Sequence, residues 1–198
     1  LRDRQPRLYD FLYQLRSKQR VMDQIRLLQP VLHISGRFSA ARHYLAPVLP
    51  LAWHPRNRNA LIVCDLQADP SPLLELDAET LRSRLYTRRE DLAEGETPVP
   101  LKLLHINRCP VVAPLSVLRE TDRQRLQLDW SSCERNMEAL KSGQPLWQEK
   151  LAAVYREETF AGSGDPEQQL YDGFIGDRDR RLCEQVRSAQ PQSLASDK

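Results

Sequence analysis

A seven-residue apolar run from Ala60 to Leu66, set between a basic turn and a pair of prolines, constrains the fold more than any other feature. Such a run is long enough for one buried strand and too short for a stable helix. The basic turn His54–Asn59 precedes it, and Asp69–Pro72 follows it. The two prolines stop a strand, because proline fixes φ and lacks a backbone N–H. We therefore predict a buried strand with a cationic turn at its start.

Two further segments are typical of strands. Pro100 to Ala113 is mostly apolar and is expected to pair with the first strand, and Val31 to Ile34 forms a short run before Gly36. Pro110 suggests that the Pro100–Ala113 strand ends at a sheet edge or a bulge. Together these segments predict the centre of a small antiparallel β-barrel.

Helical patterns surround the predicted strands. Residues 5–26 carry an apolar stripe at helical spacing, and Asp77 stands where a helix N-cap belongs. The last third of the chain is helical in texture, with capping-box patterns that begin at Thr121, Ser131 and Asp165. Strands followed by runs of helices indicate an α+β fold rather than a parallel α/β sheet.

Composition places the chain among globular proteins. It has 198 residues, of which 40% are hydrophobic and 28% charged, as in ordinary soluble domains. No apolar run approaches the ~20 residues of a membrane helix, and the sequence has no charged-then-apolar pattern typical of a secretory leader. We expect a cytoplasmic protein with no membrane partner. Because the chain begins with Leu1 rather than Met, we also expect it to be a fragment.

The charge is unevenly distributed along the chain. Although the net charge is only +2, residues 1–58 hold eleven Lys and Arg against three Asp and Glu. This excess is a plausible footprint for a phosphate backbone, and solvated helix faces are the alternative.

The four cysteines do not resemble a metal site. None belongs to a C-x-x-C pair, so we expect reduced thiols. Cys64 and Cys109 lie in apolar strand runs and are expected to be small core residues, whereas Cys133 and Cys183 lie in helical segments.

Four blocks of sequence, in this order, resemble the bacterial exonuclease I family. They are PLAWHPxNRNAxI from Pro50, SPLLELD from Ser71, LRxRLYT from Leu81 and VPxKLxHINxCPV from Val99. The resemblance covers most of residues 4–140. It corresponds to the end of that family's nuclease domain and the SH3-like domain after it.

The resemblance implies a division of the chain into three parts. Residues 1–28 would be the end of the nuclease domain and a connecting helix, and 29–158 an SH3-like domain with inserted and trailing helices. Residues 159–198 would be a linker, with a hinge at Ala161–Gly164, and the start of a helical C-terminal domain. The predicted fold class is thus α+β: a small SH3-like antiparallel β-barrel with an N-terminal helix and a helical C-terminal segment.

Catalytic motifs are missing from the sequence. The family uses clustered carboxylates that hold two Mg²⁺ ions, including an Asp-x-Glu strand, and Glu75-x-Asp77 is a poor match because Asp77 suits a helix cap. There is no G-x-S-x-G elbow and no phosphate-binding G-x-x-x-x-G-K-S/T loop. We expect the Mg²⁺ ligands of the parent enzyme to lie upstream, with no catalytic or metal-binding residue and no cofactor in this segment.

A DNA-binding surface is the function that remains. In the resembling family the SH3-like domain helps to close a channel around single-stranded DNA, and arginines with an aromatic side chain suit backbone tracking. Trp53 could instead plug the barrel, and His105 could hydrogen-bond within the core. The candidate DNA-binding residues are Arg37, Arg42, Trp53, His54, Arg56, Arg58, His105, Asn107 and Arg108.

The family resemblance implies a second site, for the acidic C-terminal tail of the single-stranded-DNA-binding protein. The matching positions are Phe11, Arg119 and Lys141, and Arg119 suits a bidentate contact to a carboxylate. Arg119 could alternatively be an exposed charge at a helix entry. The family's basic or amide side chains are replaced by Gln29, Pro114 and Trp130, which points to a remodelled pocket.

The leading hypothesis is therefore a fragment of a monomeric 3′ to 5′ single-stranded-DNA exonuclease that acts in DNA repair and recombination. This segment would supply DNA grip and partner docking. The alternative is a non-catalytic protein-interaction module whose basic surface binds acidic peptides.

Overall fold

The computed structural model describes residues 1–156 and 176–189. Its contacts divide the chain into two units, Leu1–Glu157 and Glu158–Lys198. In the second unit the described element is helix α8, Asp177–Ser188. The expected hinge at Ala161–Gly164 and the capping box at Asp165 lie outside the described residues.

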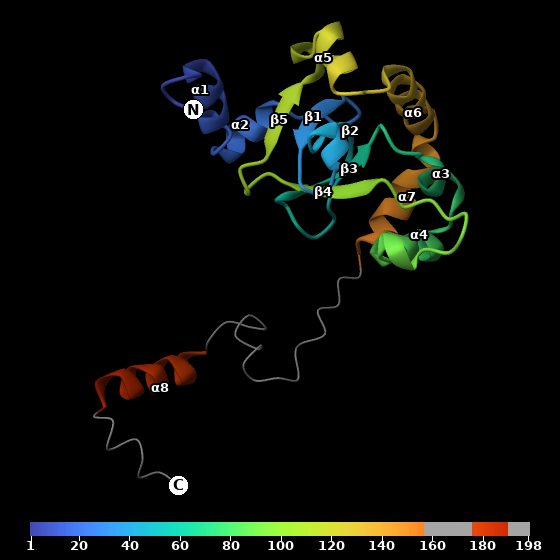
Figure 1. Cartoon of the computed structure of the whole chain (residues 1–198). Coiled ribbons are helices and arrows are strands. Elements are labelled where there is room, and N and C mark those ends of the chain that lie inside the picture. The colour runs from blue at the N-terminus through green and yellow to red at the C-terminus, as the bar shows by residue number, and fades with distance from the viewer. Residues whose placement is uncertain (157–175, 190–198) are drawn as a thin grey trace. The chain divides into compact units, whose positions relative to one another are not determined.

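A five-stranded antiparallel sheet forms the centre of the first unit (Figure 1). Its order is β4-β3-β2-β1-β5, so β4 and β5 are its edges and the hydrogen-bonded ladder is open rather than a closed barrel. The strands are β1 Val31–Ile34, β2 Leu45–Trp53, β3 Ala60–Asp65, β4 Leu101–His105 and β5 Val111–Pro114. The α+β class is confirmed.

The strand predictions are confirmed for β1 and β3 and are partly wrong elsewhere. The predicted strand Pro100–Ala113 is two strands, because a turn follows His105 and Cys109 has a left-handed backbone with φ of 48°. β4 pairs with β3 as expected, whereas β5 pairs with β1 at the far edge. Most of β2 was not predicted. It tolerates Pro50 because the register shifts between Pro50 and Ala52.

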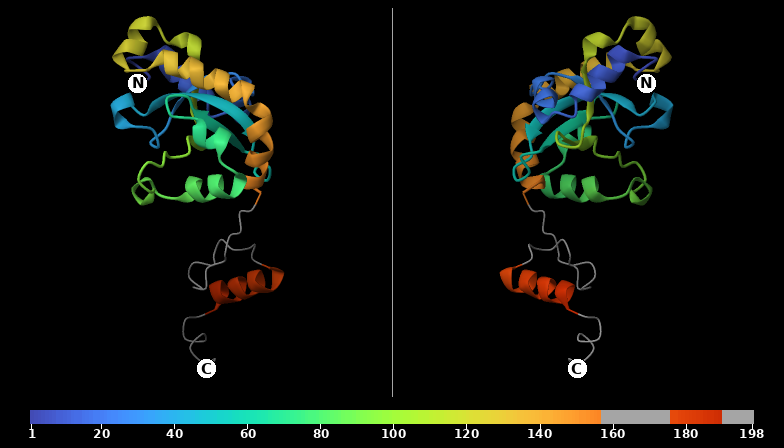
Figure 2. Two further views of the ribbon diagram at one scale, coloured as in Figure 1. Left: turned by 90° about the vertical axis from the view of Figure 1, so that its right-hand side faces the viewer. Right: turned by 90° about the vertical axis from the view of Figure 1, so that its left-hand side faces the viewer.

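One face of the sheet is covered by helices α3 (Ser71–Glu75), α4 (Ala78–Tyr86), α6 (Trp130–Ser142) and α7 (Gln144–Val154), as the two side views also show (Figure 2). Leu49 and Ile62 of the sheet pack there with Leu81 and Trp147. The Trp147 indole is fully buried, and its Nε1 donates to the carbonyl of Leu140 at 2.7 Å. These helices therefore bury this face of the sheet.

The other face packs against helices α1 (Pro6–Gln14) and α2 (Lys18–Asp23). The prediction of one helix over residues 5–26 is wrong. The first helix ends at Gln14, and a second begins after Ser17, which has an extended backbone. The apolar stripe continues across the break, since Leu15 and Val21 are both buried in this core.

Helix starts were predicted with mixed success. Asp77 caps α4 as expected, and its carboxylate accepts the N–H groups of Glu79 and Thr80. The capping boxes predicted to begin at Thr121 and Ser131 are wrong, because the N-cap residues are Arg119 and Asp129. Asp122 accepts the N–H of Arg119 at the start of α5 (Glu120–Arg125), and Asp129 caps α6.

Among the cysteines, Cys64 is buried as expected, but Cys109 is exposed in the β4–β5 turn, so its assignment to the core is wrong. Cys133 is also buried. No helix within the described ranges is long and apolar enough to cross a membrane.

Candidate nucleic-acid interface

The turn between β2 and β3 is built around His54. Its Nδ1 accepts the N–H groups of Arg56 at 3.2 Å and Asn57 at 3.0 Å, and its ring packs edge-on against Tyr155 at 5.3 Å. The side chain of Asn57 in turn accepts the N–H of Asn59. His54 is only 4% exposed. The expectation that it could stack on a base is wrong, because its ring scaffolds the turn.

Trp53, at the end of β2, is 39% exposed, so the alternative of a barrel plug is wrong and its indole is open to solvent. Arg56 and Arg58 are exposed on the turn that follows. Arg56 Nη1 donates to the carbonyl of Arg156 at 3.3 Å, and this single contact uses one of the five guanidinium N–H donors. An aromatic ring and two cations thus stand on one rigid hairpin.

A second turn lies against this hairpin. The N–H of Ile106 donates to the carbonyl of Asn59 at 2.9 Å, which brings the exposed Asn107 and Arg108 next to the β2–β3 turn. His105 is half-buried and pairs with Ala60 in the sheet.

Lys18, which was not among the predicted residues, joins this surface from α2, with Nζ 2.7 Å from Asn59 Oδ1. Periodicity placed Lys18 on an outer helix face, and no sequence signal pointed to the hairpin. We call the exposed side chains gathered here the hairpin patch: Lys18, Trp53, Arg56, Arg58, Asn107 and Arg108.

Arg37 and Arg42 lie elsewhere. Arg42, in the short helix η1 (Ala40–Arg42), forms a bidentate ion pair with Asp65 at the far end of β3 from the hairpin turn. Its guanidinium is therefore already engaged by a carboxylate. Arg37 is exposed in the loop before η1.

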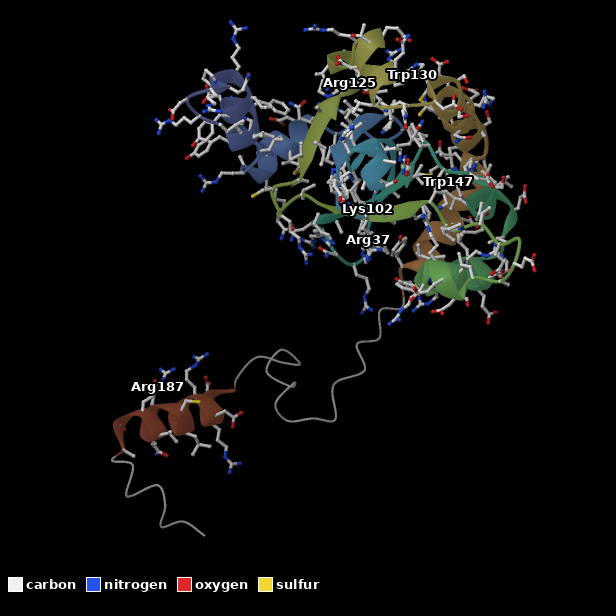
Figure 3. All side chains as sticks on the ribbon, viewed as in Figure 1. Arg37, Lys102, Arg125, Trp130, Trp147 and Arg187 are labelled. Carbon is white, nitrogen blue, oxygen red and sulfur yellow. The ribbon has the colours of Figure 1, made fainter. Side chains whose placement is uncertain are left out.

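Arg37 stands near a basic cluster that was not predicted, made of the buried His33 and the half-buried Lys102 (Figure 3). Lys102 Nζ on β4 lies 2.8 Å from His33 Nε2 on β1. Burial, and then the positive charge of Arg37, lower the pKa of Lys102 to about 8. Burial and Lys102 likewise lower the pKa of His33 to about 4, against the opposing effect of its hydrogen bond to Val111. The signal was a single charge within an apolar strand, Leu-Lys-Leu-Leu.

The expected partner residues come from three elements. Phe11 on α1 is half-buried against the core that α1 and α2 form with the sheet. Arg119 is exposed just before α5, and Lys141 is exposed in the last turn of α6. Trp130 begins α6, so Lys141 lies about 16 Å farther along the helix at ~1.5 Å per residue. The guanidinium of Arg123 covers the Trp130 ring at 3.8 Å.

Metal chemistry has no site in the part of the chain that is described. No group of three or more His, Cys, Asp or Glu side chains there could hold an ion. The residues present therefore do not fit the Mg²⁺ site of a nuclease.

Comparisons with known proteins agree on one family. The model of the Exonuclease I SH3-like domain matches residues 16–157, and that of the Exonuclease I C-terminal domain matches residues 164–198. Exodeoxyribonuclease I of Escherichia coli K12 is 44% identical over 98% of this chain and 41% of its own length. The Haemophilus influenzae protein of the same name is 37% identical, over 98% and 42%. The chain thus spans about two fifths of the length of these curated relatives.

Solved structures give the same result. The metal-free E. coli ExoI–ssDNA complex matches 98% of this chain and 42% of that chain, with a TM-score of 0.85 and 43% identity. A structure described as SSB/Exonuclease I in complex with inhibitor CFAM covers all of this chain and 41% of that chain, with a TM-score of 0.79 and 41% identity. The chain therefore belongs to the exonuclease I family and corresponds to its SH3-like and C-terminal domains.

Proposed function

We propose that this chain is part of a longer 3′ to 5′ exonuclease of DNA repair and recombination, and that it grips single-stranded DNA without catalysing its hydrolysis. The relatives are named exodeoxyribonucleases, and one solved relative is an ExoI–ssDNA complex. The hairpin patch carries the proposal, because it combines exposed cations with a solvent-open indole on a rigid hairpin. Cations neutralise phosphates without regard to sequence, and an aromatic ring stacks on any base.

Catalysis belongs, in this proposal, to the part of the parent protein outside this chain. The parent would use Mg²⁺ bound by carboxylates there, and a zinc-bound form of the E. coli ExoI–ssDNA complex supports a metal-dependent family. A clean preparation of the 198-residue chain should release no nucleotides with Mg²⁺ or Mn²⁺. Metal-dependent release by this chain would overturn the division of labour. We further propose a monomer that works in the cytoplasm.

The DNA grip is tested by the salt dependence of binding. Replacing Arg56 and Arg58 together by Ala should lower the log–log salt slope by up to about 1.4, at ~0.7 per phosphate contact on a single strand. The loss of affinity should be similar for oligonucleotides of different sequence, because backbone contacts carry no base readout. Fluorescence anisotropy with labelled oligonucleotides measures both quantities.

Arg88 and Arg89 provide a matched control, since they too are a pair of exposed arginines close in sequence but lie in the α4–β4 connection. Their replacement by Ala changes the net charge equally and should leave the salt slope unchanged. An unchanged slope in the Arg56/Arg58 variant would place the DNA path elsewhere on the domain.

A second function is docking of the single-stranded-DNA-binding protein through its acidic tail, at Arg119 with Phe11 and Lys141. A solved relative described as SSB/Exonuclease I supports it. A module that only binds acidic peptides is the competing hypothesis. Such a module would require a terminal aromatic residue and carboxylate, whereas a DNA clamp would bind any single strand with a steep salt dependence.

A further inference from the structure

His33 and Lys102 make contact although their strands, β1 and β4, are not neighbours in the sheet. β1 and β4 are separated by β2 and β3, yet Lys102 Nζ lies 2.8 Å from His33 Nε2. His33 Nδ1 is 2.9 Å from the carbonyl oxygen of Val111. A carbonyl can only accept, so Nδ1 carries the ring proton and Nε2 accepts from the ammonium. The ring therefore holds Lys102 in one position.

The ammonium has donor capacity left for a ligand. It has three N–H groups. In the described part of the chain its acceptors are His33 Nε2 and the carbonyl of Leu103, the latter at 3.4 Å. One donor therefore remains, and Lys102 is only half-buried, so an anion can reach it.

The surrounding charge is positive and uncompensated. Arg37 is exposed and close enough to lower the pKa of Lys102 by its charge. Neither forms an ion pair within residues 1–156 and 176–189. The carboxylate of Asp65 pairs with Arg42 instead.

The aromatic ring of the cluster is not available to a ligand. Phe38 is 7% exposed, and the His33 ring packs edge-on against it at 5.8 Å. Lys102 and Arg42 lie 5.8 and 5.9 Å from the Phe38 ring centre. An acidic tail that ends in an aromatic residue needs an apolar pocket beside its carboxylate contact. A phosphate backbone needs only the cations, and the cluster offers only these.

We propose that Lys102 and Arg37, with His33 positioning the Lys102 ammonium, form a second site for a backbone phosphate of single-stranded DNA, separate from the hairpin patch. Strand alternation places Lys102 and His105 on opposite faces of β4, roughly 10 Å apart along the strand. This inference rests on the proposed DNA grip and adds a phosphate site formed by β1, β4 and the loop before η1.

Binding of a phosphate at this site is coupled to the protonation of Lys102. Lys102 titrates near pH 8 in the free chain, and an adjacent phosphate raises its pKa. The neighbouring groups do not titrate in the same range. His33, with a pKa of about 4, stays neutral, and the Arg37 and Arg42 guanidinium groups stay charged. Binding above pH 8 therefore requires proton uptake and weakens as the pH rises.

The test compares Lys102→Arg with the unaltered chain, because arginine keeps the charge and does not titrate. Affinity of the unaltered chain for a labelled oligothymidylate should fall about tenfold more than that of the variant between about pH 7 and about pH 9. Lys102→Gln should bind weakly at both pH values, and Arg37→Gln should weaken binding near neutral pH. Titration of Lys102 Nζ by NMR should show a higher pKa after the oligonucleotide is added.

The Arg58→Gln variant separates this inference from the proposed function. It should weaken binding while keeping the extra fall with pH, since its guanidinium belongs to the hairpin patch. Equal pH profiles for the unaltered chain and Lys102→Arg, with DNA bound normally, would reject the second site alone. A pH-dependent step seen only with an acidic peptide would also reject it. Absence of DNA binding at every pH would reject both proposals.

Discussion

Arg42 donates two hydrogen bonds to the carboxylate of Asp65, from Nη1 to Oδ1 at 3.2 Å and from Nη2 to Oδ2 at 2.8 Å. Asp65 also accepts the N–H of Gln67 at 2.9 Å. The pair ties η1 to the end of β3 and so holds the β1–β2 connection against the sheet. An arginine expected to bind DNA thus has a structural role.

Arg42→Gln should therefore lower the free energy of unfolding by roughly 1.5–3 kcal/mol, the range for hydrogen bonds to charged groups. Urea denaturation of the 198-residue chain measures the change. Arg37→Gln serves as the control, because Arg37 is exposed and should change stability by at most about 0.5 kcal/mol. If Arg42→Gln left stability unaltered and weakened DNA binding instead, Arg42 would belong to the DNA path after all.

The cap of α6 makes stability depend on pH. Hydrogen bonds from the side chain and then the N–H of Ser132, with a further one from Ser131, lower the pKa of Asp129 to about 2. A depressed pKa means that the stabilisation is fully present above the unfolded value of 3.8 and is lost as the pH falls towards about 2. Asp129→Asn keeps a capping side chain without the charge. Its midpoint of thermal unfolding should lie below that of the unaltered chain at neutral pH, and the difference should shrink across this window. A difference that persisted below the window would contradict the assignment.

Trp53 offers a test of base stacking. Trp53→Ala should weaken binding of single strands by about 1–3 kcal/mol, the usual contribution of an aromatic platform. Because the indole is 39% exposed, the same change should cost far less folding energy than Trp147→Ala in the core. Anisotropy with oligonucleotides measures the first quantity and urea denaturation the second. Undiminished DNA affinity in Trp53→Ala would remove the indole from the interface.

The hairpin was predictable because short-range signals agree there. An apolar run of strand length, a turn with Asn57 and Asn59, and two following prolines leave few alternatives. The split of residues 100–113 was not predictable from the same signals. The apolar pattern continues through the turn, and neither the left-handed backbone at Cys109 nor the pairing of β5 with the distant β1 has a local sequence signal.

The candidate site likewise has residues whose placement local sequence predicted and residues whose role depends on distant partners. Exposed arginines next to Trp53 followed from local sequence, as did the Asp77 cap. The roles of His54, Arg42 and Lys102 depend on partners far away in sequence, namely Tyr155, Asp65 and His33. Sequence alone gives no distance between such residues. It could mark Lys102 only as a charge in an apolar strand.

Trp130, at the start of α6 beside the proposed docking site, already has partners of its own. Trp130 is covered by Arg123 at 3.8 Å, and its Nε1 donates to Glu134 at 2.9 Å. A ring that is already stacked and hydrogen-bonded makes a poor substitute for a free basic side chain. Arg119, exposed before α5, contacts Asp122 through its backbone N–H and its carbonyl, which leaves its guanidinium available for a carboxylate.

Arg119→Ala should therefore weaken binding of a peptide that ends in an aromatic residue and a carboxylate roughly ten- to a hundredfold, as expected for a charge-assisted contact of about 1.5–3 kcal/mol. Arg119→Glu should bind the peptide more weakly still, because the new side chain repels the peptide's carboxylate. Arg125→Glu is the matched control, since Arg125 lies at the other end of α5 from Arg119, is 73% exposed in its side chain and pairs with Asp122 at 3.5 Å. Anisotropy of the labelled peptide measures all three variants. If Arg119→Glu and Arg125→Glu bound the peptide equally well, the docking site would not include Arg119, and the substitutions at Gln29, Pro114 and Trp130 would indicate loss of the pocket.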